Sequence, residues 1–276
     1  MTPDSFELHL QRRGLFSSDA VAYDTGRPGY PEPVYDLLRQ VCGLGPGADV
    51  VEVGPGTGQA TGRLLDLGAT VTAVELSPDF AALLGTRFAG RALSVMVGPF
   101  EDVALPQVAF DLVAAATSFH WVPTDAGLRR CAELLRPGGW LALWWTYFGD
   151  PDRPDPFRDA LTPIFEQLAP SLVDVFPGVA FMAGAHPYAL DAPARMAEID
   201  ASAAFGPVRC ETVAWTGHHA AAELRAMFAS FSPCLALPDH QRRAVLDALE
   251  ALATEQFHGV VERPYLTVVY LAQRRR

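Results

Sequence analysis

The sequence predicts an α/β protein with a doubly wound, mostly parallel sheet. Short apolar segments of strand length alternate with longer segments of helical periodicity through the first half of the chain, and this alternation is typical of parallel strands joined by helices. The strand-like segments are apolar throughout, which suits a sheet covered by helices on both faces. Half of the 276 residues are hydrophobic, so a substantial core can form.

The first predicted elements surround a glycine-rich turn. Apolar residues recur at helical spacing over 34–41, and a short apolar strand then ends at Val53. The turn leads into an amphipathic helix over 60–67. A second strand ends at Glu75, after which Ser77 is expected to cap the next helix.

Three more strands are expected in the first half of the chain, at 92–97, 110–116 and 140–145. Between the last two, Thr124 begins a helix that we expect to stop at the Pro-Gly-Gly of 137–139.

The composition changes after the fifth strand. A stretch rich in Pro and Asp begins at Asp150 and indicates a boundary. The next segment looks helical and apolar, and we expect it to form a cap over the sheet. Strands at 208–216 and 265–272 would complete a seven-stranded sheet whose last strand is antiparallel. The expected parts are 1–149 and 206–276, which form one domain, and 150–205, which is the inserted helical cap.

The charge composition excludes several classes of function. The formal net charge is −11, and the sequence contains no Lys. Such a chain has no Schiff-base nucleophile and no P-loop lysine, and its acidic balance disfavours nucleic-acid substrates. No run reaches the roughly 18 apolar residues of a membrane span. The first residues do not resemble a signal peptide, so a cytoplasmic location is expected.

The cysteines and histidines show no metal-ligand spacing. The four cysteines are far apart and form no Cys-x-x-Cys pair, so we expect reduced, mostly buried thiols. His218 and His219 are adjacent, which makes shared ligation of one metal awkward, and they precede a predicted helix. We expect a solvated helix terminus there and no bound metal.

The most specific motif is VEVGPGTG at 51–58. Gly54, Gly56 and Gly58 follow a strand and let the backbone turn sharply and approach a ligand. The next helix points its N-terminal N–H groups at the same place. Ligands of open α/β sheets bind outside the carboxyl ends of the strands, where this turn lies. The simplest alternative is a tight turn without a ligand.

Two other nucleotide-binding motifs fit this turn poorly. The fingerprint G-x-G-x-x-G fails because its sixth position is Gln59 when counted from Gly54 and Thr61 when counted from Gly56. A P-loop fails because no Gly-Lys-Ser/Thr follows. Glu75, about twenty residues beyond the first glycine, can accept hydrogen bonds from both hydroxyls of a ribose. The alternative for this acid is an exposed residue at a strand end.

Later segments resemble one family. GPFEDVALPQVAFDLVAAATSFHWV and ELLRPGGWLAL are similar to the class I S-adenosylmethionine-dependent methyltransferases, most closely to the bacterial small-molecule group that includes relatives of trans-aconitate methyltransferase. The resemblance implies a Rossmann-like fold and S-adenosylmethionine as the cofactor, with S-adenosylhomocysteine as its product and no metal. It is weakest from about 150 to 205.

The resemblance also implies which residues bind the cofactor. The N-terminal YDTGRPGYP resembles the segment that closes over the methionine end, the acid-x-Gly-x-Gly-x-Gly pattern begins at Glu52, and the loop that packs on adenine begins at Phe100. The expected cofactor-binding residues are Tyr23, Arg27, Glu52, Gly54, Gly56, Gly58, Glu75, Leu76, Phe100, Glu101 and Thr117.

Elementary chemistry agrees with this assignment. Arg27 can pair with the cofactor's carboxylate in a bidentate fork, Glu75 can bind the ribose, and Phe100 can flank adenine. The alternatives are a surface arginine in a loop for Arg27 and ordinary core packing for Phe100.

The acceptor side is predicted from the SFHW segment and the end of the fifth strand. Histidine side chains ordinarily titrate near neutrality, so His120 is the candidate general base, although it and Trp121 could instead only shape the pocket. Trp121, Trp145 and Tyr147 are the candidate substrate residues, with core packing as the alternative.

The sequence therefore predicts methyl transfer from S-adenosylmethionine to a small-molecule O-, N- or C-nucleophile. One alternative is an NAD(P)-dependent oxidoreductase, which the broken fingerprint disfavours. Another is a module that binds S-adenosylmethionine without catalysis. The aromatic residues favour an acceptor of biosynthetic type.

Overall fold

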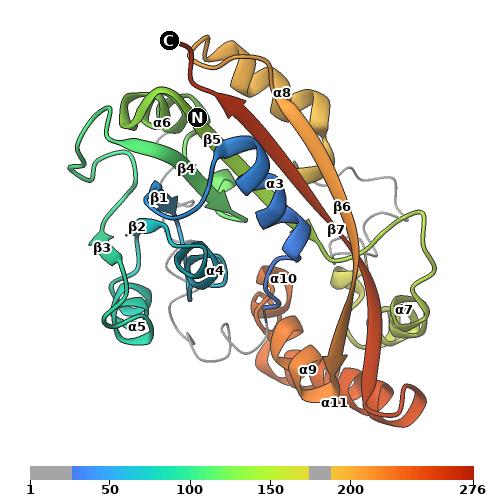
Figure 1. Cartoon of the computed structure of the whole chain (residues 1–276). Coiled ribbons are helices and arrows are strands. Elements are labelled where there is room, and N and C mark those ends of the chain that lie inside the picture. Colours follow the sequence, from blue (N-terminus) through green and yellow to red (C-terminus); the bar gives the residue numbers. More distant parts are fainter. Residues whose placement is uncertain (1–26, 174–187) are drawn as a thin grey trace.

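The computed structural model describes residues 27–173 and 188–276, and Figure 1 shows how they are arranged. One seven-stranded sheet runs through the described part of the chain and carries helices on both faces. The predicted cofactor residue Tyr23 lies outside the described residues.

The sheet has the strand order β3-β2-β1-β4-β5-β7-β6. β1 to β5 are parallel, whereas β7 is antiparallel to both β5 and β6. This arrangement confirms the predicted Rossmann-like, doubly wound fold. The order reverses between β1 and β4, where open α/β sheets bind ligands. The strands are β1 (Asp49–Val53), β2 (Thr70–Glu75), β3 (Leu93–Val97), β4 (Phe110–Ala116), β5 (Leu135–Tyr147), β6 (Arg209–Ala220) and β7 (Val260–Gln273).

Most of the described helices pack in three groups, whereas α5 packs against β2 and β3. α3 and α4 cover one face of the sheet, and α6 and α8 cover the other. α7, α9 and α11 form a separate apolar core at the end of the long β6–β7 pair, which extends past the other strands in Figure 1. The α-helices are α3 (Glu32–Cys42), α4 (Thr61–Asp66), α5 (Pro78–Arg87), α6 (Thr124–Leu134), α7 (Pro156–Leu168), α8 (Ala192–Ala201), α9 (Ala221–Ala229), α10 (Ser232–Leu235) and α11 (Asp239–Gln256). Short 3₁₀ turns lie at η2 (Phe119–Trp121), η3 (Pro170–Leu172) and η4 (Tyr188–Leu190).

Most element boundaries follow from local sequence. Ser77 caps α5 as predicted, because its side chain accepts a hydrogen bond from the Phe80 N–H. The predicted end of the helix at 137–139 is too late. α6 ends at Leu134, and the next residue already belongs to β5 because it pairs with Phe110 of β4.

The two adjacent histidines do not lie at a helix start, which corrects the prediction. Both belong to β6, because this strand stays paired with β7 as far as Ala220. His218 is exposed and lies 3.5 Å from Glu262. His219 is only 7% exposed, and its Nε2 lies 2.9 Å from the Tyr265 hydroxyl. Burial lowers the pKa of His219 to about 4, and the positive charge of Arg263 adds to this effect, so the ring is neutral near pH 7.

A buried ion pair joins the start of α7 to the last strand. Asp155 caps α7 by accepting the Arg158 N–H, and its Oδ2 lies 2.6 Å from a terminal nitrogen of Arg263 on β7. Both side chains are at least 98% buried, and Arg263 also donates to the Phe148 carbonyl. In the described residues of 150–205, α7 packs with α11 and α8 packs on α6. The proposed division into parts stays a prediction.

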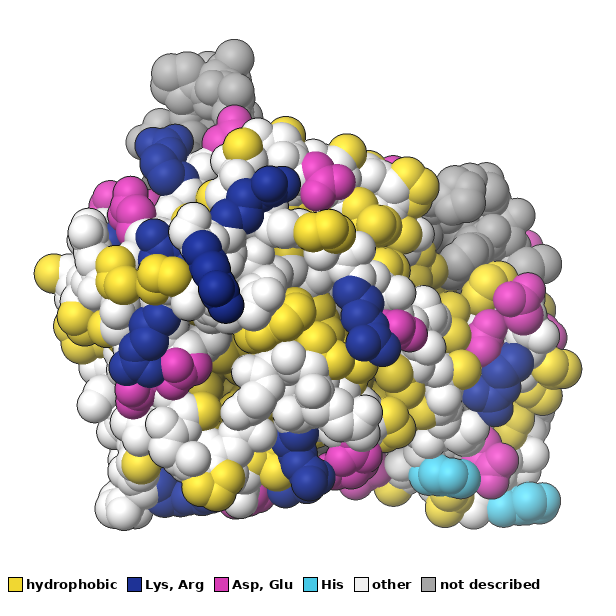
Figure 2. All heavy atoms as spheres, turned by 45° about the horizontal axis from the view of Figure 1, so that its top comes forward, with side chains coloured by type: hydrophobic (Ala, Val, Ile, Leu, Met, Phe, Trp, Pro, Cys, Tyr) yellow, Lys and Arg dark blue, Asp and Glu magenta, His cyan; other side chains and the backbone are white. Residues whose placement is uncertain are grey.

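The surface carries charges of both signs. In Figure 2, arginine side chains lie among acidic ones over the visible face. No helix in residues 27–173 and 188–276 has the length and apolar character of a membrane span. All four cysteines are free, and three are buried, as expected.

We expect Arg263→Met to lower the free energy of unfolding by about 3–5 kcal/mol, because the change leaves Asp155 charged and buried without its partner. Arg39→Met is the matched control: Arg39 pairs with Asp36 at the surface, where an ion pair contributes about 0–1 kcal/mol. Urea unfolding of both variants gives the comparison. Equal, small losses would show that the buried pair does not hold α7 to β7.

Candidate active site

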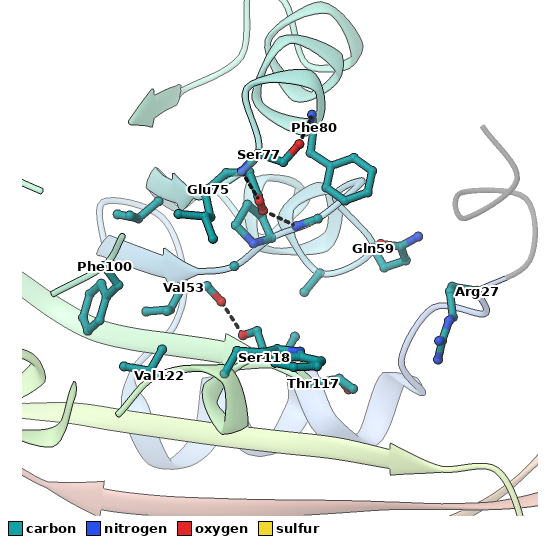
Figure 3. A pocket seen from close by; sticks show the side chains of 18 of the residues that line it. Arg27, Val53, Gln59, Glu75, Ser77, Phe80, Phe100, Thr117, Ser118 and Val122 are labelled. Carbon is teal, nitrogen blue, oxygen red and sulfur yellow. Dashed lines mark hydrogen bonds between the residues drawn. The ribbon is translucent and has the colours of Figure 1, made fainter. Parts of the chain in front are cut away.

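A cavity of about 330 Å³ lies at the carboxyl ends of β1, β2 and β4. Figure 3 shows Phe100 and Arg27 at its opposite ends, with Glu75 and Thr117 between them. Of the predicted cofactor residues, those that line it are Arg27, Gly54, Gly56, Glu75, Leu76, Phe100, Glu101 and Thr117. The fold therefore brings together residues from five separate segments of the chain.

The turn after β1 depends on glycine. Gly54, Gly56 and Gly58 all have positive φ, at 61°, 59° and 95°. Residues with a Cβ rarely adopt such a backbone conformation. A Cβ on Gly54 would lie 2.8 Å from the Cβ of Ser118, and one on Gly58 would lie 2.6 Å from the ring of Phe88. Gly54 and Gly56 face the cavity, whereas Gly58 lets the turn pack against α5.

Glu75 fixes the same turn from the neighbouring strand. Its side chain is 6% exposed, and its two oxygens accept the N–H groups of Gly56 at 3.0 Å and of Ser77 at 2.9 Å. Figure 3 shows these bonds on the cavity wall. A carboxylate has about four acceptor positions, so it can hold two backbone donors and still accept from ligand hydroxyls.

One end of the cavity wall is formed by Phe100 and Glu101. Phe100 is 4% exposed and belongs to the core, so it is both a packing residue and part of the wall. Glu101 lies beside it, and its buried Oε2 has no hydrogen-bond partner. An acidic side chain beside an aromatic ring on the cavity wall suits a flat heterocycle that carries an amino group.

Glu52 lies behind the glycine turn and does not line the cavity. The side chain is fully buried, and its Oε2 accepts the Thr61 hydroxyl at 2.6 Å. Its Oε1 is buried without a partner. Burial raises the pKa of Glu52 to about 7, against the effect of the Thr61 bond and with the help of the negative charge on Glu75.

Thr117 has an unusual backbone at the end of β4. Its φ is 54°, which is strained for a β-branched residue. Its N–H donates to the Trp144 carbonyl at 2.7 Å, and its hydroxyl accepts from the Tyr30 hydroxyl at 3.0 Å. Tyr30 also lines the cavity. Sequence reasoning missed it, although it belongs to the YDTGRPGYP segment that supplied Arg27.

The other end of the cavity joins the N-terminal and C-terminal parts of the chain. The Nε of Arg27 donates to the Ser230 hydroxyl at 3.1 Å. Its guanidinium lies 4.4 Å from the ring centroid of Phe231 and 5.5 Å from that of Phe148. This cation therefore sits in an aromatic setting that holds its planar group in place.

The predicted acceptor residues separate into two sets. Trp121 lines the cavity, but His120, Trp145 and Tyr147 are not among the lining residues. Trp145 and Tyr147 are buried, and Trp145 donates from its indole nitrogen to Nδ1 of His120. Their roles stay predictions.

At the end of β5, Thr146 and Phe148 line the cavity in place of the predicted Trp145 and Tyr147. Successive side chains of a strand point to opposite faces, so the residues next to the predicted ones form the wall. The alternation was readable in the sequence, but which face meets the cavity was not. Within the described parts of the chain, no group of His, Cys, Asp and Glu side chains is arranged to hold a metal.

Residues 51–143 match a family model described as a methyltransferase domain. Nocamycin O-methyltransferase from Saccharothrix syringae is 30% identical over 209 residues, which cover 71% of this chain and 72% of that protein. An uncharacterized methyltransferase from Mycobacterium tuberculosis is 35% identical over 130 residues, or 47% of this chain. The match spans about half the length of that relative, 51%.

A solved structure supports the fold over almost the whole chain. Phosphoethanolamine N-methyltransferase 2 from Haemonchus contortus, in complex with phosphomonomethylethanolamine and S-adenosylhomocysteine, aligns with a TM-score of 0.58 at 12% identity. The alignment covers 98% of this chain and 60% of that one. With the strand order and the relatives above, the chain belongs to the class I S-adenosylmethionine-dependent methyltransferases. The finer likeness to the trans-aconitate group stays a prediction.

We expect Gly54→Ala to destabilise the protein more than Gly43→Ala. Both glycines have positive φ, so each substitution costs about 1–2 kcal/mol for the left-handed backbone. A Cβ at Gly43 meets nothing within 4 Å, whereas one at Gly54 collides with Ser118 and adds about 1–3 kcal/mol. Chemical unfolding measures the difference. Equal losses would mean that the turn can move away from β4.

Glu52→Gln should remove a pH dependence of stability. The pKa of Glu52 is raised from about 4.5 in the unfolded chain to about 7 in the fold, so the folded protein binds this proton more tightly and loses stability as pH rises through that window. The free energy of unfolding of wild type, relative to that of Glu52→Gln, should fall by about 2 kcal/mol between about pH 5 and pH 8. Urea titrations at both pH values test this, and a constant difference would contradict it.

Proposed function

We propose that this protein transfers the methyl group of S-adenosylmethionine to a small-molecule acceptor. The observation that carries the proposal is the pair formed by the glycine turn and Glu75. The turn exposes bare backbone to the cavity, and the carboxylate that accepts the Gly56 N–H lies on the next strand at the same edge. A carboxylate at the end of the second strand, beside a glycine turn, can accept hydrogen bonds from the hydroxyls of a ribose.

The cavity residues suit the three parts of the cofactor. Phe100 and Glu101, which both line the cavity, suit adenine and its amino group. Glu75 suits the ribose hydroxyls, and Arg27 at the far end suits the carboxylate of the methionine part. Glu52 lies behind the turn and accepts the Thr61 hydroxyl, so its part in cofactor binding would be to support the turn.

The tasks of the protein in this reaction are alignment and exclusion of water. When bound, S-adenosylmethionine supplies an electrophilic methyl group and leaves as a neutral thioether. Thr117 has a strained backbone and accepts a hydrogen bond from Tyr30, and this contact fixes the end of β4 at the cavity wall. Trp121, Thr146 and Phe148 also line the cavity, and we assign them to the side from which an acceptor would approach.

We take the acceptor to be a small molecule with an oxygen, nitrogen or carbon nucleophile. The similarity to nocamycin O-methyltransferase supports an acceptor of biosynthetic type and gives oxygen some preference. The net charge of −11 and the mixed charges of Figure 2 make a nucleic-acid partner unfavourable. A cytoplasmic location is part of the same proposal.

Two other functions make different predictions for ligand binding. An NAD(P)-dependent oxidoreductase would bind a dinucleotide in this cavity, and a binding module would take S-adenosylmethionine without turning it over on any acceptor. Calorimetric titration with S-adenosylhomocysteine and with NAD separates the first from a methyltransferase. Release of S-adenosylhomocysteine in the presence of an acceptor separates the second.

Glu75→Gln should raise the Kd for S-adenosylhomocysteine by about 10- to 100-fold, because hydrogen bonds to a charged acceptor contribute about 1.5–3 kcal/mol. Calorimetry on the purified variant measures the change. Glu133→Gln removes the same charge from the surface of α6, away from the cavity, and should leave the Kd within about twofold. If wild type binds the nucleoside and Glu75→Gln binds it equally well, the ribose assignment is wrong. If wild type does not bind it, the proposed function is wrong.

A further inference from the structure

β5 contributes a polar side chain, Thr146, to the cavity wall. Thr146 lines the cavity together with Phe148, and the two share one face of the strand because they are two positions apart. The residues assigned to ribose and adenine follow β1, β2 and β3. Since β4 lies between β1 and β5, two strand spacings of about 5 Å each separate Thr146 from the glycine turn. This position favours contact with the acceptor over contact with the nucleoside.

The Thr146 hydroxyl has a buried partner behind the wall. Its Oγ1 lies 2.9 Å from Oγ1 of Thr267, which is fully buried and pairs directly with Thr146 in the register of β5 and β7. The indole nitrogen of Trp215 on β6 donates to the same Thr267 oxygen at 3.0 Å. The three side chains therefore form a hydrogen-bonded row from β6 through β7 to the cavity.

The order of donors in this row follows from the chemistry of its members. A threonine hydroxyl has one hydrogen and two lone pairs, whereas an indole N–H can only donate. Within residues 27–173 and 188–276, the hydrogen-bond partners of the Thr267 hydroxyl are Trp215 and Thr146. Thr267 therefore donates to Thr146, because the reverse order would leave the Thr267 hydrogen buried without an acceptor. The hydrogen of Thr146 is then available to a ligand in the cavity.

Aromatic packing fixes both ends of the row. Trp215 meets Tyr265 edge to face at 5.0 Å between ring centroids, and Tyr265 meets Phe148 in the same way at 5.3 Å. Tyr265 is fully buried, and its hydroxyl lies 2.9 Å from Nε2 of His219. One buried ring thus restricts the indole that begins the row and the phenylalanine beside Thr146.

We infer that Thr146 is a specificity-determining residue whose hydroxyl, positioned by Thr267, donates a hydrogen bond to the methyl acceptor. This inference rests on the proposed function. It implies an acceptor that presents an oxygen or nitrogen lone pair toward the end of β5, as a carbonyl, an ether or an imine does. The contact is a binding interaction with a group beside the atom that is methylated, and no proton leaves Thr146.

The direction of the row can be read without cofactor or acceptor. In an equal mixture of H₂O and D₂O, a threonine hydroxyl that exchanges slowly gives two ¹³Cβ signals, whereas fast exchange gives one averaged signal. In the full chain labelled with ¹³C-threonine, we expect two signals for Thr267 and one for Thr146, assigned by their loss in Thr267→Val and Thr146→Val. Two signals for Thr146, or one for Thr267, overturn the inferred direction.

A matched pair of probes tests the contact itself. Acetophenone and isopropenylbenzene have nearly the same shape, but only the ketone oxygen accepts a hydrogen bond. With S-adenosylhomocysteine at saturation, wild type should bind the ketone about 2- to 10-fold more tightly in ligand-observed NMR titrations, as one neutral hydrogen bond predicts. Thr146→Val should lose this preference, and Thr146→Ser should keep it. No preference in wild type, or a preference that survives in Thr146→Val, overturns the inference.

Two further variants test the specificity of the effect. Thr254→Val makes the same change at an exposed position of α11 and should keep the wild-type preference for the ketone. Its loss there as well would contradict a local contact. Thr267→Val keeps the Thr146 hydroxyl but removes its donor, so the preference should fall. An unchanged preference overturns the positioning role of Thr267.

Binding of S-adenosylhomocysteine separates this inference from the proposed function. Failure of wild type to bind it contradicts the proposed function, whereas the exchange measurement needs no ligand. Thr146→Val should bind it within about twofold of wild type. A loss of more than about fivefold would mean that the hydroxyl binds the methionine part of the cofactor, and this result would overturn the acceptor assignment.

Discussion

The hydrogen bond from the Gly56 N–H to Glu75 is the contact on which the site depends. It links the turn after β1 to the end of β2, and it can form only because the backbone passes through left-handed conformations at three glycines. The same turn lies so close to Ser118 of the β4 end that no side chain fits between them. Three strand ends are thereby brought around one cavity.

The sequence predicted the parts of this arrangement that are local. Val53 and Glu75 end apolar strands, and a glycine in the sequence marks a position where the backbone can turn sharply. The edge of the sheet that binds a ligand was therefore predictable. Ser77 was identified as a cap for the same reason. These features depend on a few neighbouring residues and on the strand order that βαβ alternation imposes.

The features that depend on distant pairing were not predictable. His219 is buried because β7 pairs along the whole of β6, and the residues near His219 in the sequence do not indicate this pairing. Thr146 lines the cavity and Trp145 does not, because neighbouring side chains of a strand point to opposite faces, and which face meets the cavity depends on the strands beside β5. Tyr30 reaches Thr117 only through the placement of α3. Each of these depends on a contact between separate parts of the chain.

The contacts of Arg27 have a consequence for how proteins of this kind diversify. Arg27 reaches Ser230, 203 positions further along the chain, whereas the family-matched segment is only 51–143. The nucleoside half of the cavity lies inside that segment, but Tyr30, Thr146 and Phe148 come from outside it. The family-matched segment thus supplies the residues proposed to bind the cofactor's nucleoside. The flanking segments can vary in evolution to suit a different methyl acceptor. Substitutions meant to change the acceptor should be made in the N-terminal and C-terminal segments together, because Arg27 contacts Ser230, Phe231 and Phe148.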